Sequence, residues 1–171
     1  MYITPPETER HTLSITVTNE SGVLAKIAGM FSARGYNIES LTVADISPDD
    51  EVSRITIVTS GTPHVIEQIV AQLDRMVLVH RVNDLTANGP HVERELALIK
   101  VAGTGVRHDE ARKLAEIHHA HTLDVTPSSY VFELTGSSEE IETFIALMSE
   151  IGAVEVARTG IVAISRGKAA A

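Results

Sequence analysis

The chain has 171 residues, of which 43% are apolar and 22% charged, and its formal net charge at pH 7 is −9. This length fits one ordinary domain or two small ones, and the apolar fraction is typical of globular proteins. The acidic balance argues against binding to DNA, RNA or anionic membranes, and the absence of cysteine excludes disulfides, thiolate metal sites and cysteine nucleophiles.

The first half of the chain predicts elements in the order strand, helix, strand, strand, helix, strand. Strands are indicated where apolar and polar residues alternate, and helices where apolar residues recur three or four positions apart. The predicted elements are a strand at 13–17, a helix at 24–31, strands at 38–46 and 52–59, a helix at 63–73 and a strand at 77–82.

The second half repeats this order. Gly61 and Gly136 hold equivalent positions, because an amphipathic helix with a start signal follows each of them. Thr62 precedes a proline at the first helical position, and Ser137 with Glu140 forms a capping box. The predicted elements are strands at 96–101, 123–126 and 130–134, helices at 109–118 and 138–151, and strands between 154 and 164.

This repeated order predicts an α+β fold made of two ferredoxin-like βαββαβ domains in tandem. The first domain is expected at 12–86 and the second at 91–167, with flexible tails at 1–11 and 168–171. The chain contains neither an apolar run long enough to cross a membrane nor the pattern of a signal peptide. A cytoplasmic protein is therefore expected.

Motifs that carry catalytic chemistry are scarce. Gly103-Thr104-Gly105 lacks the third glycine of a dinucleotide-binding fingerprint and is better interpreted as a strand-to-helix turn. Four histidines, at 108, 118, 119 and 121, lie in one stretch, but no carboxylate sits at ligand spacing, so surface histidines are favoured over a metal site. The acidic turn with Asp45, Asp49, Asp50 and Glu51 lacks the pattern of a calcium loop and indicates a solvated hairpin.

One segment does suggest a binding site. Asn19-Glu20-Ser21-Gly22 lies between the first predicted strand and the first helix. Backbone N–H groups in the first turn of a helix bind anions such as carboxylates, and a glycine there leaves them accessible. Asn37 offers an amide oxygen that would accept a hydrogen bond from an ammonium group. Together these groups would suit an α-amino acid, although Asn and Gly are also ordinary cap and turn residues.

The sequence resembles the regulatory (small) subunit of acetolactate synthase, also called acetohydroxyacid synthase. The most specific stretch is Arg34-Gly35-Tyr36-Asn37-Ile38-Glu39-Ser40-Leu41, since related amino-acid-sensing domains share only the looser Asn-x-x-Gly-x-Leu pattern of residues 19–24. Further segments that carry the resemblance are 31–33, 42–43, 53–57, 91–96, 124–128 and 154–160.

The resemblance implies that the first domain is an ACT domain and that valine binds where two such domains meet in a homodimer. The valine contacts would be Asn19, Gly22, Val23, Leu24 and Asn37, with Asn37 contributed by the neighbouring chain. It also implies a catalytic partner subunit that holds thiamine diphosphate, magnesium and FAD, while this chain holds no cofactor.

The function expected from the resemblance is a non-catalytic subunit that activates its partner and confers feedback inhibition by valine in branched-chain amino acid biosynthesis. One alternative is a free-standing amino-acid-responsive ACT-type regulator of transcription or of another enzyme. A DNA-binding regulator would need a helix-turn-helix and a basic face, and the sequence predicts neither. A second alternative is an enzyme that uses a metal bound by the histidines.

Overall fold

A computed structural model of the chain describes residues 7–49 and 51–167. Its contacts divide the chain into two compact units. The first contains the residues up to Val92 and those from Ile161 onward, and the second contains Glu93–Gly160. Of the tails expected from the sequence, residues 1–6 and 168–171 lie outside the described residues.

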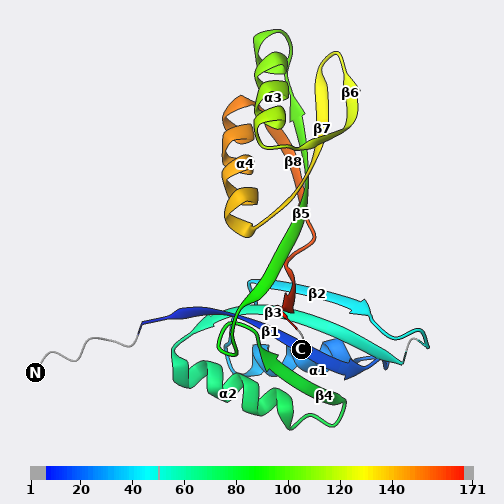
Figure 1. The fold of residues 1–171 in the computed structure, drawn as a ribbon, viewed down its shortest axis with the longest axis vertical. Helices are drawn as coiled ribbons and strands as arrows, with labels where there is room; N and C mark the ends of the chain where they lie inside the picture. The colour runs from blue at the N-terminus through cyan, green and yellow to red at the C-terminus, as the bar shows by residue number, and fades with distance from the viewer. Residues whose placement is uncertain (1–6, 50, 168–171) are drawn as a thin grey trace, which may run out of the picture. The chain divides into compact units, whose positions relative to one another are not determined.

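The first unit is an antiparallel sheet with two helices on one face (Figure 1). Its strand order is β2-β3-β1-β4, so each helix connects two strands that are consecutive in the chain but are separated by another strand in the sheet. Its elements are β1 (Glu9–Thr18), α1 (Val23–Ala33), β2 (Ser40–Asp45), β3 (Val52–Gly61), α2 (Pro63–Asp74) and β4 (Val79–Asp84).

The core of this unit lies between the sheet and its helices. Leu13, Ile15 and Val17 point from β1 toward the helices, because they belong to the same buried cluster as Ile27 of α1 and Ile69 of α2. Side chains alternate between the two faces of a strand. The residues between them in β1 therefore lie on the opposite face of the sheet.

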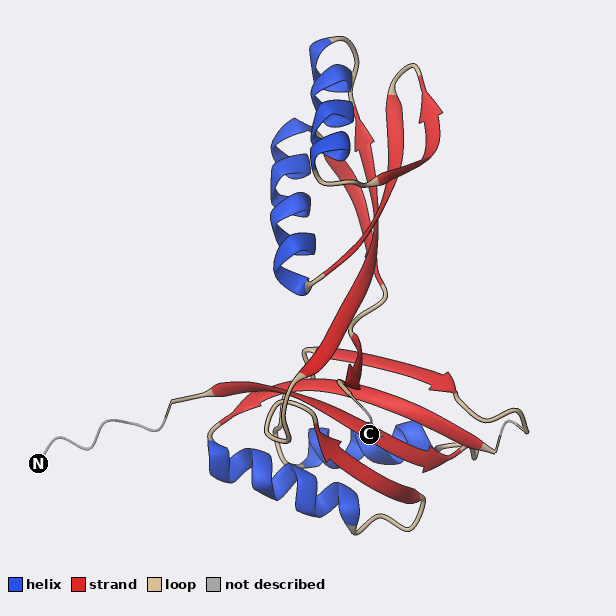
Figure 2. Cartoon of the chain, viewed as in Figure 1, coloured by secondary structure: helices blue, strands red, loops and turns tan. Residues whose placement is uncertain are grey.

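The second unit repeats this architecture, with strand order β6-β7-β5-β8 and both helices on one side of the sheet (Figure 2). Its elements are β5 (His91–Ala102), α3 (Val106–Ile117), β6 (His121–Thr126), β7 (Ser129–Gly136), α4 (Ser138–Ile151) and β8 (Ala153–Arg158). Two βαββαβ units in tandem confirm the fold class predicted from the sequence. Within the described residues, no helix is long and apolar enough to cross a membrane.

The start of the first domain differs from the prediction. Residues 9–11 belong to β1 instead of to a flexible tail, and they pair with Gly61, Ser60 and Thr59 of β3. His11 is buried, and its Nδ1 lies 2.7 Å from Oδ2 of Asp84. Pairing with β3 and the buried His11–Asp84 contact order residues 9–11, whose polar composition alone indicated a flexible tail.

The second compact unit ends before residue 167, where the sequence places the end of the second domain. Gly160, with φ 84°, ends the second unit, and β9 (Val162–Ser165) belongs to the first unit. Ile161 and Ala163 are buried against Val58 and Leu85 on the face of the first sheet that carries no helix. The burial of Ile161 and Ala163 explains why the chain returns to the first sheet after the second unit.

The helix start signals have different outcomes. The capping box of α4 is confirmed: the Ser137 hydroxyl accepts from the Glu140 N–H at 3.3 Å, and the Ser137 N–H donates to Glu140 Oε2 at 2.7 Å. These bonds lower the pKa of Glu140. Thr62 does occupy the N-cap of α2, but its side chain makes no capping hydrogen bond.

We expect Ser137→Ala to lower the free energy of unfolding by about 1 kcal/mol, because the substitution removes a side-chain cap. Thr62→Ala is the matched control and should change stability far less. The lowered pKa of Glu140 means that the capping box contributes above the ordinary pKa of a Glu side chain and is lost as pH falls through the folded value. Urea unfolding of both variants at neutral and acidic pH tests this, and equal losses at both caps would contradict it.

Candidate functional site

Hydrogen bonds fix the loop that joins β1 to α1. The Asn19 N–H donates to the Glu51 carbonyl at 2.8 Å, which ties the loop to the start of β3. The Glu20 carbonyl accepts from the Val23 N–H at 3.1 Å. The predicted site residues Asn19 and Gly22 are both exposed on this loop.

Gly22 leaves the N-terminus of α1 open. Its φ is 87°, in the left-handed region that favours glycine, and a Cβ built at this position would meet no atom within 4 Å. In the described part of the chain, the N–H groups of Leu24 and Ala25 have no hydrogen-bond acceptor. The first turn of α1 also contains no acidic residue. Its partial positive charge is therefore available to an anion.

The two apolar residues of the predicted site have different roles. The Val23 side chain is only 7% exposed and belongs to the core cluster of the first unit. The Leu24 side chain is 39% exposed. Of the pair, only Leu24 exposes its side chain to solvent, while Val23 packs the start of the helix against the sheet.

Asn37 lies far from Gly22 within one chain. It is exposed, and its carbonyl accepts from the Thr59 hydroxyl at 2.6 Å. In the ladder, Thr59 pairs with His11, whereas Thr18, just before the Gly22 loop, pairs with Val52. At about 3.4 Å per residue, these ends of β3 are about 24 Å apart. The structure brings Asn19, Gly22, Val23 and Leu24 together and does not bring Asn37 to them.

The histidine stretch of the second unit has structural contacts. His108 stacks on Tyr130 with ring centroids 4.1 Å apart, and its Nε2 lies 3.0 Å from the Thr126 carbonyl oxygen. His118 lies against Phe144 at 5.3 Å. These two rings pack on aromatic neighbours, which the sequence interpretation as surface histidines missed. Among residues 7–49 and 51–167, no three His, Asp or Glu side chains gather to hold a metal ion.

The acidic turn between β2 and β3 is tied to the sheet. Asp45 Oδ1 accepts from the Ser53 hydroxyl at 2.7 Å, and the Ser47 hydroxyl accepts from the Glu51 N–H at 3.1 Å. Asp50 lies outside the described residues. The Gly103-Thr104-Gly105 segment leads into α3 with Gly105 as its N-cap, in agreement with its interpretation as a strand-to-helix turn.

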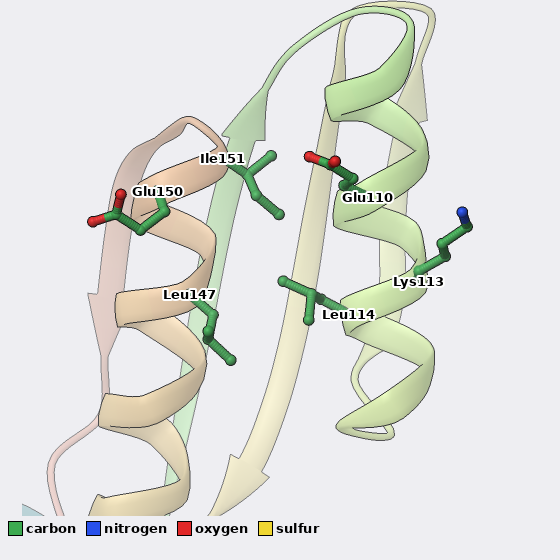
Figure 3. Close-up of a pocket in the computed structure, with 6 residues that line it drawn as sticks. All are labelled: Glu110, Lys113, Leu114, Leu147, Glu150 and Ile151. Atoms are coloured by element: carbon green, nitrogen blue, oxygen red, sulfur yellow. The ribbon is translucent and has the colours of Figure 1, made fainter.

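An open groove of about 400 Å³ runs between the two helices of the second unit (Figure 3). Leu114 of α3 and Leu147 and Ile151 of α4 point into it, while charged side chains stand at its rim. The groove is apolar, and no residue of the predicted valine site lines it.

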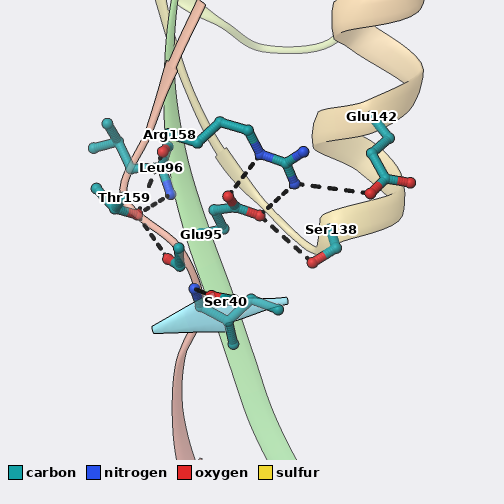
Figure 4. A network of polar contacts seen from close by, with 9 residues as sticks. Ser40, Glu95, Leu96, Ser138, Glu142, Arg158 and Thr159 are labelled. Carbon is teal, nitrogen blue, oxygen red and sulfur yellow. Dashed lines mark hydrogen bonds and ion pairs between the residues drawn. The ribbon is translucent and has the colours of Figure 1, made fainter. Parts of the chain in front are cut away.

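A buried ion pair that sequence reasoning missed lies in the second unit (Figure 4). The Glu95 side chain is 4% exposed and accepts two hydrogen bonds from the Arg158 guanidinium, each at 2.7 Å. This pairing with Glu95 raises the pKa of Arg158. The Ser138 hydroxyl is 3.5 Å from the same carboxylate. Glu95 precedes the strand predicted at 96–101, so the sequence carries no signal for such a pair; in the structure Glu95 lies within β5.

Comparisons with known proteins agree with the resemblance carried by residues 31–43. A family model described as small subunit of acetolactate synthase matches residues 94–167, and one described as AHAS small subunit-like ACT domain matches residues 13–81. The acetolactate synthase isozyme 3 small subunit of Escherichia coli (strain K12) is 46% identical over 159 residues, which span 92% of this chain and 96% of that protein.

More distant organisms give similar matches. The probable acetolactate synthase small subunit of Archaeoglobus fulgidus is 42% identical over 158 residues, covering 92% of this chain and 98% of that protein. The crystal structure of the acetolactate synthase small subunit from Thermotoga maritima aligns with a TM-score of 0.85 at 37% identity, covering 94% of this chain and 99% of that chain.

Proposed function

Because the chain belongs to the acetolactate synthase small subunit family, we propose that it binds an acetolactate synthase catalytic subunit, raises its activity and makes that activity sensitive to valine. The observation that carries the valine proposal is the open N-terminus of α1 beside Gly22. In this proposal, the catalytic subunit holds the cofactors of the reaction, which are thiamine diphosphate, magnesium and FAD. The proposal also places the complex in the cytoplasm.

The proposed valine site uses both termini of the ligand. The valine carboxylate accepts from the N–H groups of Leu24 and Ala25, which have no acceptor among the described residues. The isopropyl group lies against the exposed part of Leu24. The side-chain oxygen of Asn37 accepts from the valine ammonium.

The separation between Gly22 and Asn37 supports a homodimer. One chain holds these two residues at opposite ends of β3, so a second copy must supply Asn37 to complete each site. A twofold-symmetric pair forms two such sites, and symmetric pairing is the common arrangement for homo-oligomers. Valine would then act by favouring the less active arrangement of the complex by about 1–3 kcal/mol.

The direct test is to mix the purified chain with the catalytic subunit and measure acetolactate formation with and without valine. We expect no product from the chain alone, a higher rate from the mixture and inhibition of that higher rate by valine. Product from the isolated chain, or an unchanged rate after mixing, would refute the proposed function.

Asn37→Ala should weaken valine inhibition without abolishing it. The substitution removes one hydrogen bond to a charged group, which is worth about 1.5–3 kcal/mol, so the half-inhibitory valine concentration should rise about tenfold to a hundredfold. The measurement is partner activity across a valine titration. The Thr59 contact uses the backbone carbonyl of Asn37 and survives the substitution, so circular dichroism should show an unchanged fold.

Mixing two defective chains tests the shared site. A heterodimer of Gly22→Asp and Asn37→Ala chains contains one site with both changes and one site with neither. Refolding the two variants together should therefore restore inhibition at low valine concentration in part of the population. If every mixture behaves as the sum of the separate variants, both halves of the site come from the same chain.

A further inference from the structure

The face of the first sheet that carries no helix has a cationic row, although the chain as a whole is acidic. Arg54 of β3 and Arg81 of β4 are the direct neighbours of Thr16, which lies between them in β1. Thr16 alternates with the core residues Ile15 and Val17, so all three residues of the row lie on the helix-free face. The two arginine Cα atoms are two strands apart, about 10 Å.

Neither arginine of this row pairs with a carboxylate of the described residues. Within residues 7–49 and 51–167, neither guanidinium has an ion pair or a hydrogen bond to a side chain, and Arg54 Nε is buried without an acceptor. The strand positions that the register assigns to this face contain no Asp or Glu. They are Arg10, Thr12, Ser14, Thr16, Thr18, Ser40, Thr42, Ala44, Val52, Arg54, Thr56, Val58, Ser60, Arg81 and Asn83. The carboxylate of Glu39, the residue before β2, pairs with Arg10 at 3.3 Å rather than with Arg54 or Arg81.

A cavity and an unpartnered hydroxyl adjoin the row. Ser14 pairs with Asn83 in the next row and is 2% exposed, and its Oγ finds no hydrogen-bond partner among the residues that the structure describes. Asn83 and Arg81 line a partly open cavity of about 220 Å³, together with Leu85, the 88–90 turn and Ser165. The Asn88 amide donates to Asn83 Oδ1 at 2.7 Å and holds the rim. Arg81, the Asn83 and Asn88 amides and Ser165 thus line one hollow, and Ser14 and Arg54 lie beside it in the adjoining strand rows.

We propose that this row and cavity form a second ligand site, distinct from the Gly22 loop, for a small oxyanion with two acidic groups. One acidic group pairs with Arg81 at the cavity and the other with Arg54 across Thr16. Guanidinium groups recognise phosphates and carboxylates alike through paired N–H donors. The site accordingly suits a diphosphate or a dicarboxylate, and it is independent of valine and of the catalytic partner.

The test uses the full chain alone, followed by amide NMR during titration with sodium pyrophosphate in one series and sodium succinate in another. We expect saturable chemical-shift changes at the amides of Thr16, Arg81 and Asn83 with at least one probe. The probe with the lower dissociation constant shows whether the natural ligand carries phosphate or carboxylate groups. Arg54→Gln and Arg81→Gln should each raise the dissociation constant about tenfold or more. Added NaCl should weaken binding, because the arginines are partly exposed.

Arg75→Gln is the matched control, since it removes the same charge from an exposed position at the end of α2. It should leave the dissociation constant unchanged. Ser14→Ala should weaken binding without lowering the melting temperature, because the hydroxyl it removes has no partner in the protein. The proposal fails if neither probe shifts these amides, or if Arg75→Gln weakens binding as much as the two row variants.

Discussion

Gly22→Asp is expected to abolish valine inhibition while the protein stays folded and still activates its partner. A Cβ at Gly22 meets no atom within 4 Å, so the new side chain fits. Its carboxylate would stand beside the N–H groups proposed to bind the carboxylate of valine. Two like charges about 4 Å apart repel by about 1 kcal/mol in water and about 4 kcal/mol at a partly buried site.

The repulsion is large compared with the free energy of valine binding. An amino acid that binds with millimolar to micromolar affinity gains only about 4–8 kcal/mol in total. Repulsion near the upper value, together with the space that the side chain occupies, should raise the half-inhibitory valine concentration more than about a hundredfold. The positive φ of 87° adds a separate cost for any side chain, about 1 kcal/mol, which lowers the stability of the fold without unfolding it.

Two control variants separate charge from backbone strain. Gly22→Asn carries the same backbone cost and nearly the same volume without the charge, so it should retain more of the inhibition than Gly22→Asp. Gly105→Asp places the same carboxylate at the N-cap of α3, where a Cβ is also unopposed. The backbone there, with φ 61° and ψ −126°, costs a side chain more than at Gly22, so circular dichroism must first show that this variant is folded. It should leave inhibition unchanged. A folded Gly22→Asp protein that is inhibited at wild-type valine concentrations would show that valine binds elsewhere.

Arg158→Ala is expected to destabilise the second unit by about 3 kcal/mol. It leaves the Glu95 carboxylate, which is 4% exposed, without its two guanidinium donors. Breaking a buried ion pair costs about 3–5 kcal/mol, and the lower end applies because the Arg158 side chain is 35% exposed and water would reach the site. Urea unfolding and amide exchange in β5 and β7 measure the loss.

Arg112→Ala is the control within the same unit. Arg112 pairs with Glu116 at 2.7 Å on the exposed face of α3, and such i,i+4 pairs contribute only about 0.3–0.5 kcal/mol. The double variant Glu95→Leu with Arg158→Leu should recover most of the stability lost in Arg158→Ala, since no charge is then left buried. Similar losses in the Arg158 and Arg112 variants would mean that the Glu95 pair contributes no more than a surface pair.

Local patterns in the sequence were enough to predict both βαββαβ units. The apolar–polar alternation of residues 13–17 and the helical spacing around Ile66 and Ile141 depend on which face of an element is buried, and this is encoded within a few residues. The capping box at Ser137 was equally predictable, because both of its bonds close within one turn. The position of Gly22 before α1 followed from the same local order.

Features that depend on partners distant in the chain were not predictable in this way. The sequence predicts strands between 154 and 164 without showing which sheet each one joins. In the structure the second unit ends at Gly160, which has a positive φ, and Ile161 and Ala163 pack against Val58 and Leu85 of the first unit. In the sequence alone, Glu95 resembles a surface residue. Only the folded structure shows that it is buried beside Arg158.

The residues proposed to bind ligands also divide into those that the sequence could place and those that only the tertiary structure could place. The sequence alone placed a glycine at the start of α1, because a helix N-terminus is a local feature. Only the tertiary structure decided that Asn37 lies at the other end of β3, and that Arg54 and Arg81 flank Thr16 on one face. Strand order and register set these distances, and both arise from packing between segments that are far apart in the chain.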